Sequence, residues 1–306
     1  MNQRGLFVFL LALAIGSNAG AYTDLVVFGD SLSDAGNSTS VSLGVVPGAA
    51  YWKGRYSNGP IYVERLAKHL ELGEVKCSNA GGNIFASGGA HTSGTKGNRE
   101  AFVDDLDEQV ARFLARKKVD SQALYVIWIG ANDLLDGQRN VKVPVTNIGK
   151  SLTKLYDAGA RRFLVMNLPQ LGSAPRYHRR PDRAKYMNKL TLDFNQRLAR
   201  ELNRIDRRLG EAELLRFDIQ AYFEDVVANP DKFGLTDTRN SAAPGLDVGT
   251  FLYDKRVISP TPEKFLYWDI VHPTTTMHAQ LADSLHAFLQ EQDEQHPVGS
   301  TAAGGE

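Results

Sequence analysis

The stretch DLVVFGDSL, residues 24–32, joins a short run of β-branched and aromatic residues to a glycine, an aspartate and a serine. The apolar run from Asp24 to Phe28 predicts a buried strand, and Gly29-Asp30-Ser31-Leu32 predicts the start of a helix directly after it. A serine at such a junction is an ordinary helix cap, yet it also lies where unpaired backbone N–H groups favour developing negative charge. Ser31 is therefore a candidate nucleophile as well as a candidate cap.

Strand-like and helical segments continue to alternate along the rest of the chain. The predicted strands span residues 75–78, 123–129, 163–167 and 214–217. The predicted helices span residues 61–72, 103–117, 145–158, 190–209 and 273–290, and a long loop region is predicted over residues 229–264. The alternation indicates one α/β domain with a parallel sheet covered by helices on both faces, in which ligands bind beyond the carboxyl ends of the strands.

The composition fits one large globular domain and argues against nucleic acid as a partner. The chain has 306 residues, is 42% hydrophobic and carries 35 basic and 35 acidic residues. Without a basic excess, it lacks the charge needed to follow a phosphate backbone. Three basic clusters, at residues 112–118, 176–185 and 204–208, lie in or beside helical patterns, and we interpret them as solvated helix faces.

The start of the chain differs in kind from the rest. Arg4 precedes an apolar run over residues 6–15, and Ala19-Gly20-Ala21 has the small-x-small pattern of a cleavage site. The apolar run is much shorter than the ~20 residues that span a bilayer. We expect a protein that is secreted or periplasmic after cleavage near Ala21. The expected parts are a signal peptide at 1–21, the folded domain at 22–290 and a disordered tail at 291–306.

Export usually favours disulfides, but Cys77 is the only cysteine. No disulfide can therefore form within the chain, and packing must hold the fold. Because Cys77 lies in a strand-like run, we expect a buried thiol rather than a catalytic one.

Two segments offer hydrogen-bond donors without a charge. Gly88 and Gly89 lie in a glycine-rich stretch that can bring a backbone N–H close to a substrate oxygen, although a simple turn explains the stretch equally well. Asn132 follows the strand predicted at 123–129, and its side chain carries an N–H₂ group. An Asx turn is the structural alternative for Asn132.

The last segment places Asp269 three residues before His272, just ahead of the final predicted helix. A carboxylate that accepts from one ring nitrogen fixes the tautomer, so the other nitrogen is free to take a proton from Ser31. Metal binding by His272 and His278 is a weaker alternative, because their spacing puts them on different faces of a helix. Together the segments supply a nucleophile, neutral oxyanion donors and an oriented base, and we expect no metal or organic cofactor.

At these positions the chain strongly resembles the GDSL, or SGNH, family of serine esterases and lipases, especially its branch of secreted bacterial lipases, phospholipases and acyltransferases. The resemblance covers nearly the whole chain after residue 21. Five blocks occur in the family's order: VFGDSLSDAGN at 27–37, GRYSNGP at 54–60, ASGGA at 86–90, IGAND at 129–133 and YWDIVHPT at 267–274. NLPQLG at 167–172 resembles a further segment of the branch.

The resemblance implies a three-layer α/β/α sandwich with a mainly parallel, flavodoxin-like sheet, the SGNH hydrolase fold. It also implies that Ser31 is the nucleophile, that His272 is the general base and that Asp269 orients His272. Ser57, in the second block, is not the nucleophile.

The family's oxyanion hole maps onto the backbone N–H groups of Ser31 and Gly89 and onto the Asn132 side chain. One position departs from the family pattern, which usually has an Asn two residues before the Ala of the glycine block. This chain has Ile84 there, so Gly88 remains an alternative to Gly89.

By the same resemblance, we expect a hydrolase that cleaves carboxylic esters through an acyl-enzyme. The expected substrate is a lipid ester, with a phospholipid or lysophospholipid ahead of triacylglycerol, and the expected state is a monomer with transient contact with membranes or lipid aggregates. An acyltransferase that passes the acyl group to a sterol or other alcohol is the nearer alternative, and an exported non-catalytic binding protein is the more distant one. Aromatic residues in predicted loops are candidates to line an acyl groove, namely Tyr51, Trp52, Phe233, Phe251 and Tyr253.

Overall fold

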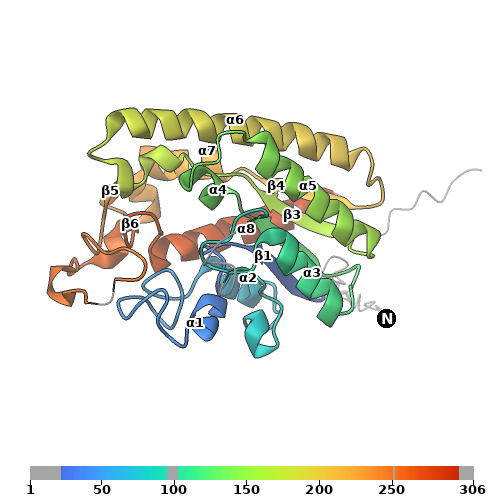
Figure 1. The fold of residues 1–306 in the computed structure, drawn as a ribbon, viewed down its shortest axis with the longest axis horizontal. Coiled ribbons are helices and arrows are strands. Elements are labelled where there is room, and N and C mark those ends of the chain that lie inside the picture. The colour runs from blue at the N-terminus through green and yellow to red at the C-terminus, as the bar shows by residue number, and fades with distance from the viewer. Residues whose placement is uncertain (1–21, 95–102, 251, 296–306) are drawn as a thin grey trace, which may run out of the picture.

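The computed structural model describes residues 22–94, 103–250 and 252–295, and its centre is a parallel sheet (Figure 1). Four strands pair in the order β1-β2-β3-β4, and they span Leu25–Gly29, Leu124–Trp128, Arg162–Met166 and Glu213–Phe217. The first three strands are buried along their whole length, as expected for a parallel sheet covered on both faces. The predicted signal peptide, Phe251 and residues 296–306 of the predicted tail lie outside the described residues.

A fifth segment, residues 83–87, extends the sheet beyond β1. The Val27 N–H donates to the Asn83 carbonyl at 3.0 Å, and the Phe85 N–H donates to the Val27 carbonyl at 2.7 Å. The second sheet segment in the sequence thus lies outside the first, which is the flavodoxin-like order. The strand predicted at 75–78 is wrong, because a 3₁₀ turn, Ser78–Ala80, begins there and only an isolated parallel bridge from Cys77 to Ile84 forms among the described residues of this segment.

Helices cover both faces of the sheet (Figure 1). The α-helices of the described residues span Asn37–Val41 (α1), Tyr62–His69 (α2), Leu106–Arg116 (α3), Ala131–Leu135 (α4), Lys142–Asp157 (α5), Pro181–Asp206 (α6), Ile219–Ala228 (α7) and Thr275–Gln295 (α8). α2 packs against α8, whereas α5 packs against both α3 and α6. Right-handed crossovers place these two groups on opposite faces of a parallel sheet, which completes the predicted three layers.

Some boundaries differ from the predicted ones. α6 begins at Pro181, whereas the predicted helix began at residue 190. The prediction missed the first turns of α6 because they are mostly exposed and lack an apolar period. The region predicted as a long loop contains β5 (Asp237–Ser241), which pairs in parallel with β6 (Phe265–Tyr267). α8 continues to Gln295, into the first residues of the predicted tail, and α7 had no predicted counterpart.

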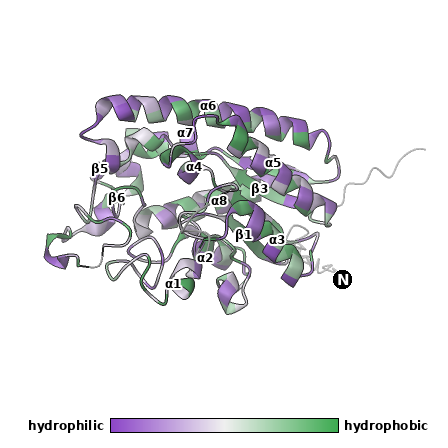
Figure 2. Cartoon of the chain, in the orientation of Figure 1, coloured by the Kyte–Doolittle hydropathy of each residue, from purple (hydrophilic) through white to green (hydrophobic). Residues whose placement is uncertain are grey.

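Apolar residues gather on the strands and on the inner sides of the helices (Figure 2). α6 buries the stripe that its period predicts, including Leu190, Phe194, Leu198, Leu202 and Ile205. Among the described residues, no helix is both long and apolar enough to cross a membrane.

Candidate active site

The carboxyl ends of β1 and β2 meet where the fold predicts a ligand site. Gly29 pairs with Trp128 at these ends, and the segment 83–87 flanks β1 on its other side. From β1 the chain therefore continues to the segment 83–87 on one side, whereas from β2 it continues to β3 on the other. The point between β1 and β2 is a topological switch point, and doubly wound sheets bind ligands at such points. Ser31 follows β1 and Asn132 follows β2, so the topology brings together two predicted site residues that lie far apart in the sequence.

Ser31 lies in a turn rather than at the start of a helix. The Ser33 N–H donates to the Asp30 carbonyl at 3.1 Å, and α1 begins only at Asn37. The prediction that Ser31 caps a helix is wrong, because this turn precedes any helical hydrogen bond. Gln109 of α3 holds the end of β1 just before this turn: its side chain donates to the Gly29 carbonyl at 2.8 Å and accepts from the Gly29 N–H at 2.9 Å.

Ser31, His272 and Asp269 form a continuous chain of hydrogen bonds. Ser31 Oγ lies 2.9 Å from His272 Nε2, and His272 Nδ1 lies 2.7 Å from Asp269 Oδ2. All three residues are buried, Asp269 completely. The structure thus brings together the three residues that the sequence singled out, in an order that can pass the Ser31 hydroxyl proton to the imidazole.

The carboxylate of Asp269 has a hydrogen-bond donor at each oxygen. Oδ1 accepts from the backbone N–H groups of Val271 at 2.8 Å and His272 at 2.6 Å. Oδ2 accepts from His272 and from the Tyr51 hydroxyl, the latter at 2.6 Å. Sequence reasoning missed this role of Tyr51, because 218 positions separate it from Asp269 and no local pattern links them.

The two ionisable members of this chain shift each other's pKa in opposite directions. Burial alone would raise the pKa of Asp269, but the His272 charge and the hydrogen bonds from His272 and Tyr51 outweigh burial and hold this pKa below its ordinary value. Burial alone would lower the pKa of His272, but the Asp269 carboxylate, and more weakly Asp30 and Asp247, hold it above its ordinary value. Asp269 is therefore a stable anion that favours the imidazolium form of His272.

The backbone N–H groups of Gly88 and Gly89 differ in their hydrogen bonds. The Gly88 N–H donates to Asp34 Oδ2 at 3.0 Å and to Ser38 Oγ at 2.9 Å. A Cβ on Gly88 would come within 1.9 Å of the Tyr56 hydroxyl, so only glycine fits there. Gly89 has a φ of +81° beside open space, and its N–H has no acceptor among the described residues. Of the two candidates, Gly89 is the one whose N–H is available to a substrate.

The side chain of Asn132 lies beside the same glycine loop. Its Nδ2 donates to the Ala90 carbonyl at 3.0 Å, which ties α4 to the residue after Gly89. An amide nitrogen carries two hydrogens, so one remains for a ligand in the cavity that Asn132 and Ser31 both line. The Ser31 N–H likewise has no acceptor in the described part of the chain. Three uncharged donors are therefore available at the switch point.

Two buried polar residues after Ser31 hold the glycine loop. Asp34 accepts from the N–H of Gly88 and from the backbone N–H groups of residues 36–38. Asn37 donates through Nδ2 to the carbonyls of Ile84 and Ala86, both at 2.8 Å. Ile84 is fully buried and bridges to β1, so an apolar residue suits this position.

The block at residues 54–60 holds the loop that carries His272. Ser57 Oγ donates to the Pro273 carbonyl at 2.9 Å, and Asn58 Oδ1 accepts from the Thr275 N–H at 2.8 Å. The Tyr56 ring lies 5.2 Å from the His272 ring, centre to centre. Ser57 is thus engaged in positioning the loop that carries His272.

A cavity of about 70 Å³ opens at Ser31, and much of its wall is apolar, including Trp128, Leu135, Leu168, Leu171 and Phe223. The aromatic residues predicted to line an acyl groove do not line this cavity. Tyr51 binds Asp269, Phe233 packs against Tyr222, and the Tyr253 hydroxyl donates to the Pro244 carbonyl. Trp52 lies under the charged groups of its neighbours Lys53 and Arg55, and Phe251 lies outside the described residues.

His278, the candidate metal ligand, and Cys77, the candidate catalytic thiol, both lie in the core. His278 stacks on Tyr62 and accepts from the Tyr62 N–H through Nδ1 at 3.3 Å. Burial, with the charges of His272 and Arg65, lowers the pKa of His278 to about 3, so its ring is neutral. Cys77 is buried, as predicted.

A hydroxyl, an imidazole and a buried carboxylate in series, beside uncharged N–H donors at the switch point of an α/β sheet, define a serine hydrolase that transfers acyl groups. The model of the GDSL-like lipase/acylhydrolase family matches residues 25–285. The chain belongs to this family, and it is an ester-cleaving serine hydrolase or acyltransferase.

Individual relatives carry different names. Phosphatidylcholine-sterol acyltransferase of Aeromonas hydrophila is 28% identical over 90% of this chain and 92% of its own length. Thermolabile hemolysin of Vibrio parahaemolyticus is 27% identical over 85% of this chain, which spans 62% of the hemolysin. A solved structure of a lipolytic G-D-S-L family protein from Veillonella parvula is 10% identical and aligns over 89% of this chain and 97% of its own, with a TM-score of 0.45.

Proposed function

We propose that Ser31 is the nucleophile, His272 the general base and Asp269 the carboxylate that orients it, in the hydrolysis of a lipid ester. The hydrogen-bonded chain from Ser31 Oγ through His272 to Asp269 carries this proposal. The available N–H groups of Ser31, Gly89 and Asn132 support an oxyanion hole at the same place.

In the proposed cycle, His272 Nε2 takes the Ser31 proton as Oγ bonds to the ester carbonyl carbon. The carbonyl oxygen becomes an oxyanion, which the three N–H donors stabilise. The C–O bond to the alcohol then breaks, and the alcohol leaves with the proton from His272. Water next gives a proton to His272 and adds to the acyl carbon, and Ser31 regains its proton as the carboxylic acid leaves.

The apolar wall of the catalytic cavity supports an acyl chain as its ligand, and the name of the Aeromonas hydrophila relative points to a phospholipid ester and a sterol acceptor. Transfer to a sterol or another alcohol is the second candidate, since the same acyl-enzyme can react with either acceptor. A series of p-nitrophenyl esters of increasing chain length tests the hydrolase, with a burst of nitrophenol as the expected result. Phospholipid supplied with cholesterol tests the transferase, whose product is the sterol ester.

Asn132→Ala should lower kcat by about 10²–10³, because it removes one oxyanion donor. Steady-state kinetics on a p-nitrophenyl ester measure the effect, and the melting temperature reports the lost hydrogen bond to the Ala90 carbonyl separately. Asn229→Ala, at an exposed position after α7, is the matched control and should leave kcat unchanged. Full activity in Asn132→Ala would remove this residue from the site.

The activity should fall on acidification through the pKa of His272, since only the neutral imidazole can accept the Ser31 proton. Because Asp269 holds this pKa above its ordinary value, the acid limb of kcat/KM should lie above about pH 6.5. Below it, kcat/KM should drop about tenfold per pH unit. A pH profile of the chromogenic assay measures the limb, and a profile that stayed flat down to about pH 4 would exclude His272 as the base.

We further propose that residues 1–21 are a signal peptide and that the remaining chain works outside the cytoplasm as a monomer, in transient contact with lipid aggregates. The pattern of Arg4, the apolar run and Ala19-Gly20-Ala21 supports export. The mass of the protein recovered from the periplasm or medium tests the cleavage, because a mature chain should begin at Tyr22. Light scattering of that mature chain tests the oligomeric state.

A further inference from the structure

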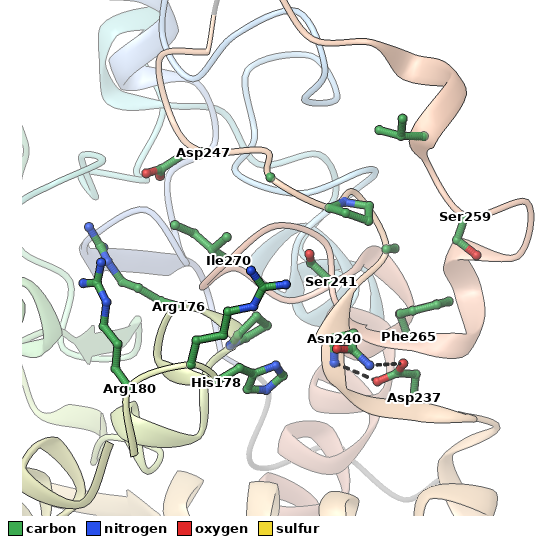
Figure 3. A pocket seen from close by; sticks show the side chains of 16 residues that line it. Arg176, His178, Arg180, Asp237, Asn240, Ser241, Asp247, Ser259, Phe265 and Ile270 are labelled. Carbon is green, nitrogen blue, oxygen red and sulfur yellow. Dashed lines mark hydrogen bonds between the residues drawn. The ribbon is translucent and has the colours of Figure 1, made fainter. Parts of the chain in front are cut away.

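A second, larger cavity lies behind the loop that carries His272. Its volume is about 950 Å³, and its wall combines the residues that follow Ala174 with the region from β5 to β6 (Figure 3). A cavity of this size can hold a polar group as large as a lipid head group. It contains none of the residues that form the hydrogen-bonded chain at Ser31.

One layer of chain separates the two cavities. Ile270 lines the larger cavity, whereas the next residue, Val271, lines the catalytic one. In the same way Pro175 lines the larger cavity and Ala174 the catalytic one. The Arg176 N–H donates to the Ile270 carbonyl at 2.9 Å and so joins the two halves of this wall.

Three arginines line the larger cavity, Arg176, Arg179 and Arg180. All three are exposed, and none forms an ion pair within the described part of the chain. In Figure 3 the side chains of Arg176 and Arg180 extend in the same direction, and Asp237 and Asn240 lie across the cavity from them. These arginines precede α6, so they are not the solvated helix face that the sequence predicted for this basic cluster.

The two carboxylates of the cavity wall accept hydrogen bonds from their own segments. Asp237 accepts from the N–H groups of Arg239 at 2.9 Å and Asn240 at 2.7 Å, and from the Asn240 side chain at 2.8 Å. Asp247 accepts from the Val248 N–H at 2.8 Å. The wall therefore offers three guanidinium groups against two carboxylates that already have donors, which favours an anionic ligand.

We propose that this cavity binds a phosphate group carried by the alcohol part of the ester that Ser31 cleaves. Guanidinium groups match phosphate oxygens with paired hydrogen bonds, which makes arginine a common residue for phosphate recognition. The inference rests on the proposed function, because the leaving alcohol must take its proton from His272 and therefore lies on the side of the His272 loop. That loop is also a wall of the larger cavity, hereafter the arginine cavity, so the substrate class is an ester whose alcohol part carries a phosphate group.

The test compares esters that share one acyl chain, each used below the concentration at which it aggregates. The substrates are octanoyl lysophosphatidic acid, monooctanoylglycerol and p-nitrophenyl octanoate, of which only the first carries phosphate. Arg176→Gln, Arg179→Gln and Arg180→Gln combined should raise KM for lysophosphatidic acid about tenfold to a hundredfold, since hydrogen bonds between charged groups are lost. For the two substrates without phosphate, kcat and KM should keep their wild-type values, which also shows that the variant folds.

A matched control replaces three exposed arginines elsewhere, Arg200, Arg207 and Arg208, by glutamine, so that the net charge changes equally. The control should behave as the wild type with all three substrates. An unchanged KM for lysophosphatidic acid in the cavity variant would overturn the proposal, and so would an equal change for monooctanoylglycerol. Saturable calorimetric binding of inorganic phosphate that the variant loses, with unchanged lysophosphatidic acid kinetics, would identify an anion site separate from the substrate and overturn it too.

Failure of the proposed function has a different signature. A wild-type protein that cleaved none of the three esters would contradict the role of Ser31, whatever the arginines do. Calorimetry with glycerol phosphate would then still decide whether the cavity binds a phosphate on an alcohol. Equal binding by the wild type and the cavity variant would show that these arginines do not bind it.

Discussion

Ser31→Ala should reduce kcat by about a millionfold, as expected when the nucleophile of a hydrogen-bonded catalytic unit is removed. The alanine cannot form the acyl-enzyme, and the remaining activity comes from water positioned by the oxyanion donors. Steady-state kinetics with a p-nitrophenyl ester measure the loss. Mass spectrometry of the wild type quenched during turnover should show the acyl group on the peptide that contains Ser31.

The same variant separates the enzyme from an exported binding protein that merely keeps the fold. Ser40→Ala, at an exposed position in α1, is the matched control and should retain the wild-type kcat. If neither protein released nitrophenol with any chain length, the binding-protein alternative would stand. If Ser31→Ala kept the burst, another residue would be the nucleophile.

The sheet could be predicted largely from the sequence, because β1, β2 and β3 are short apolar runs that the fold buries completely. The segment 83–87 escaped prediction, since it pairs with β1 over few residues and its register depends on Asn37, which is distant in the sequence. β5 also escaped prediction. Its residues are polar, and its pairing with β6 is irregular.

The site shows the same division between local and distant contacts. Asp269 and His272 are three residues apart, so their contact could be anticipated from the sequence. The choice between Gly88 and Gly89 could not, because it depends on where Asp34, Ser38 and Tyr56 place the loop. The arginine cavity also exists only in three dimensions, since residues 175–180 and 237–270 form its wall together.

Asp269→Asn should lower kcat by about 10⁴, through the tautomer of His272 rather than through its position. An asparagine keeps the size of the side chain but replaces one acceptor oxygen by an N–H₂ group. At the Oδ1 position that group would meet the fixed N–H groups of Val271 and His272, which cannot reorient. At the Oδ2 position it would meet the Tyr51 hydroxyl and the imidazole, which can.

The amide nitrogen should therefore take the Oδ2 position and donate to His272 Nδ1. The imidazole must then carry its proton on Nε2, where it faces Ser31 Oγ and can no longer accept the Ser31 proton. Proton NMR should show the loss of the Nδ1–H signal in Asp269→Asn and its retention in Asp254→Asn, a control at an exposed position paired with Arg256. A kcat close to the wild-type value in Asp269→Asn, with the tautomer changed, would mean that His272 does not act as the base.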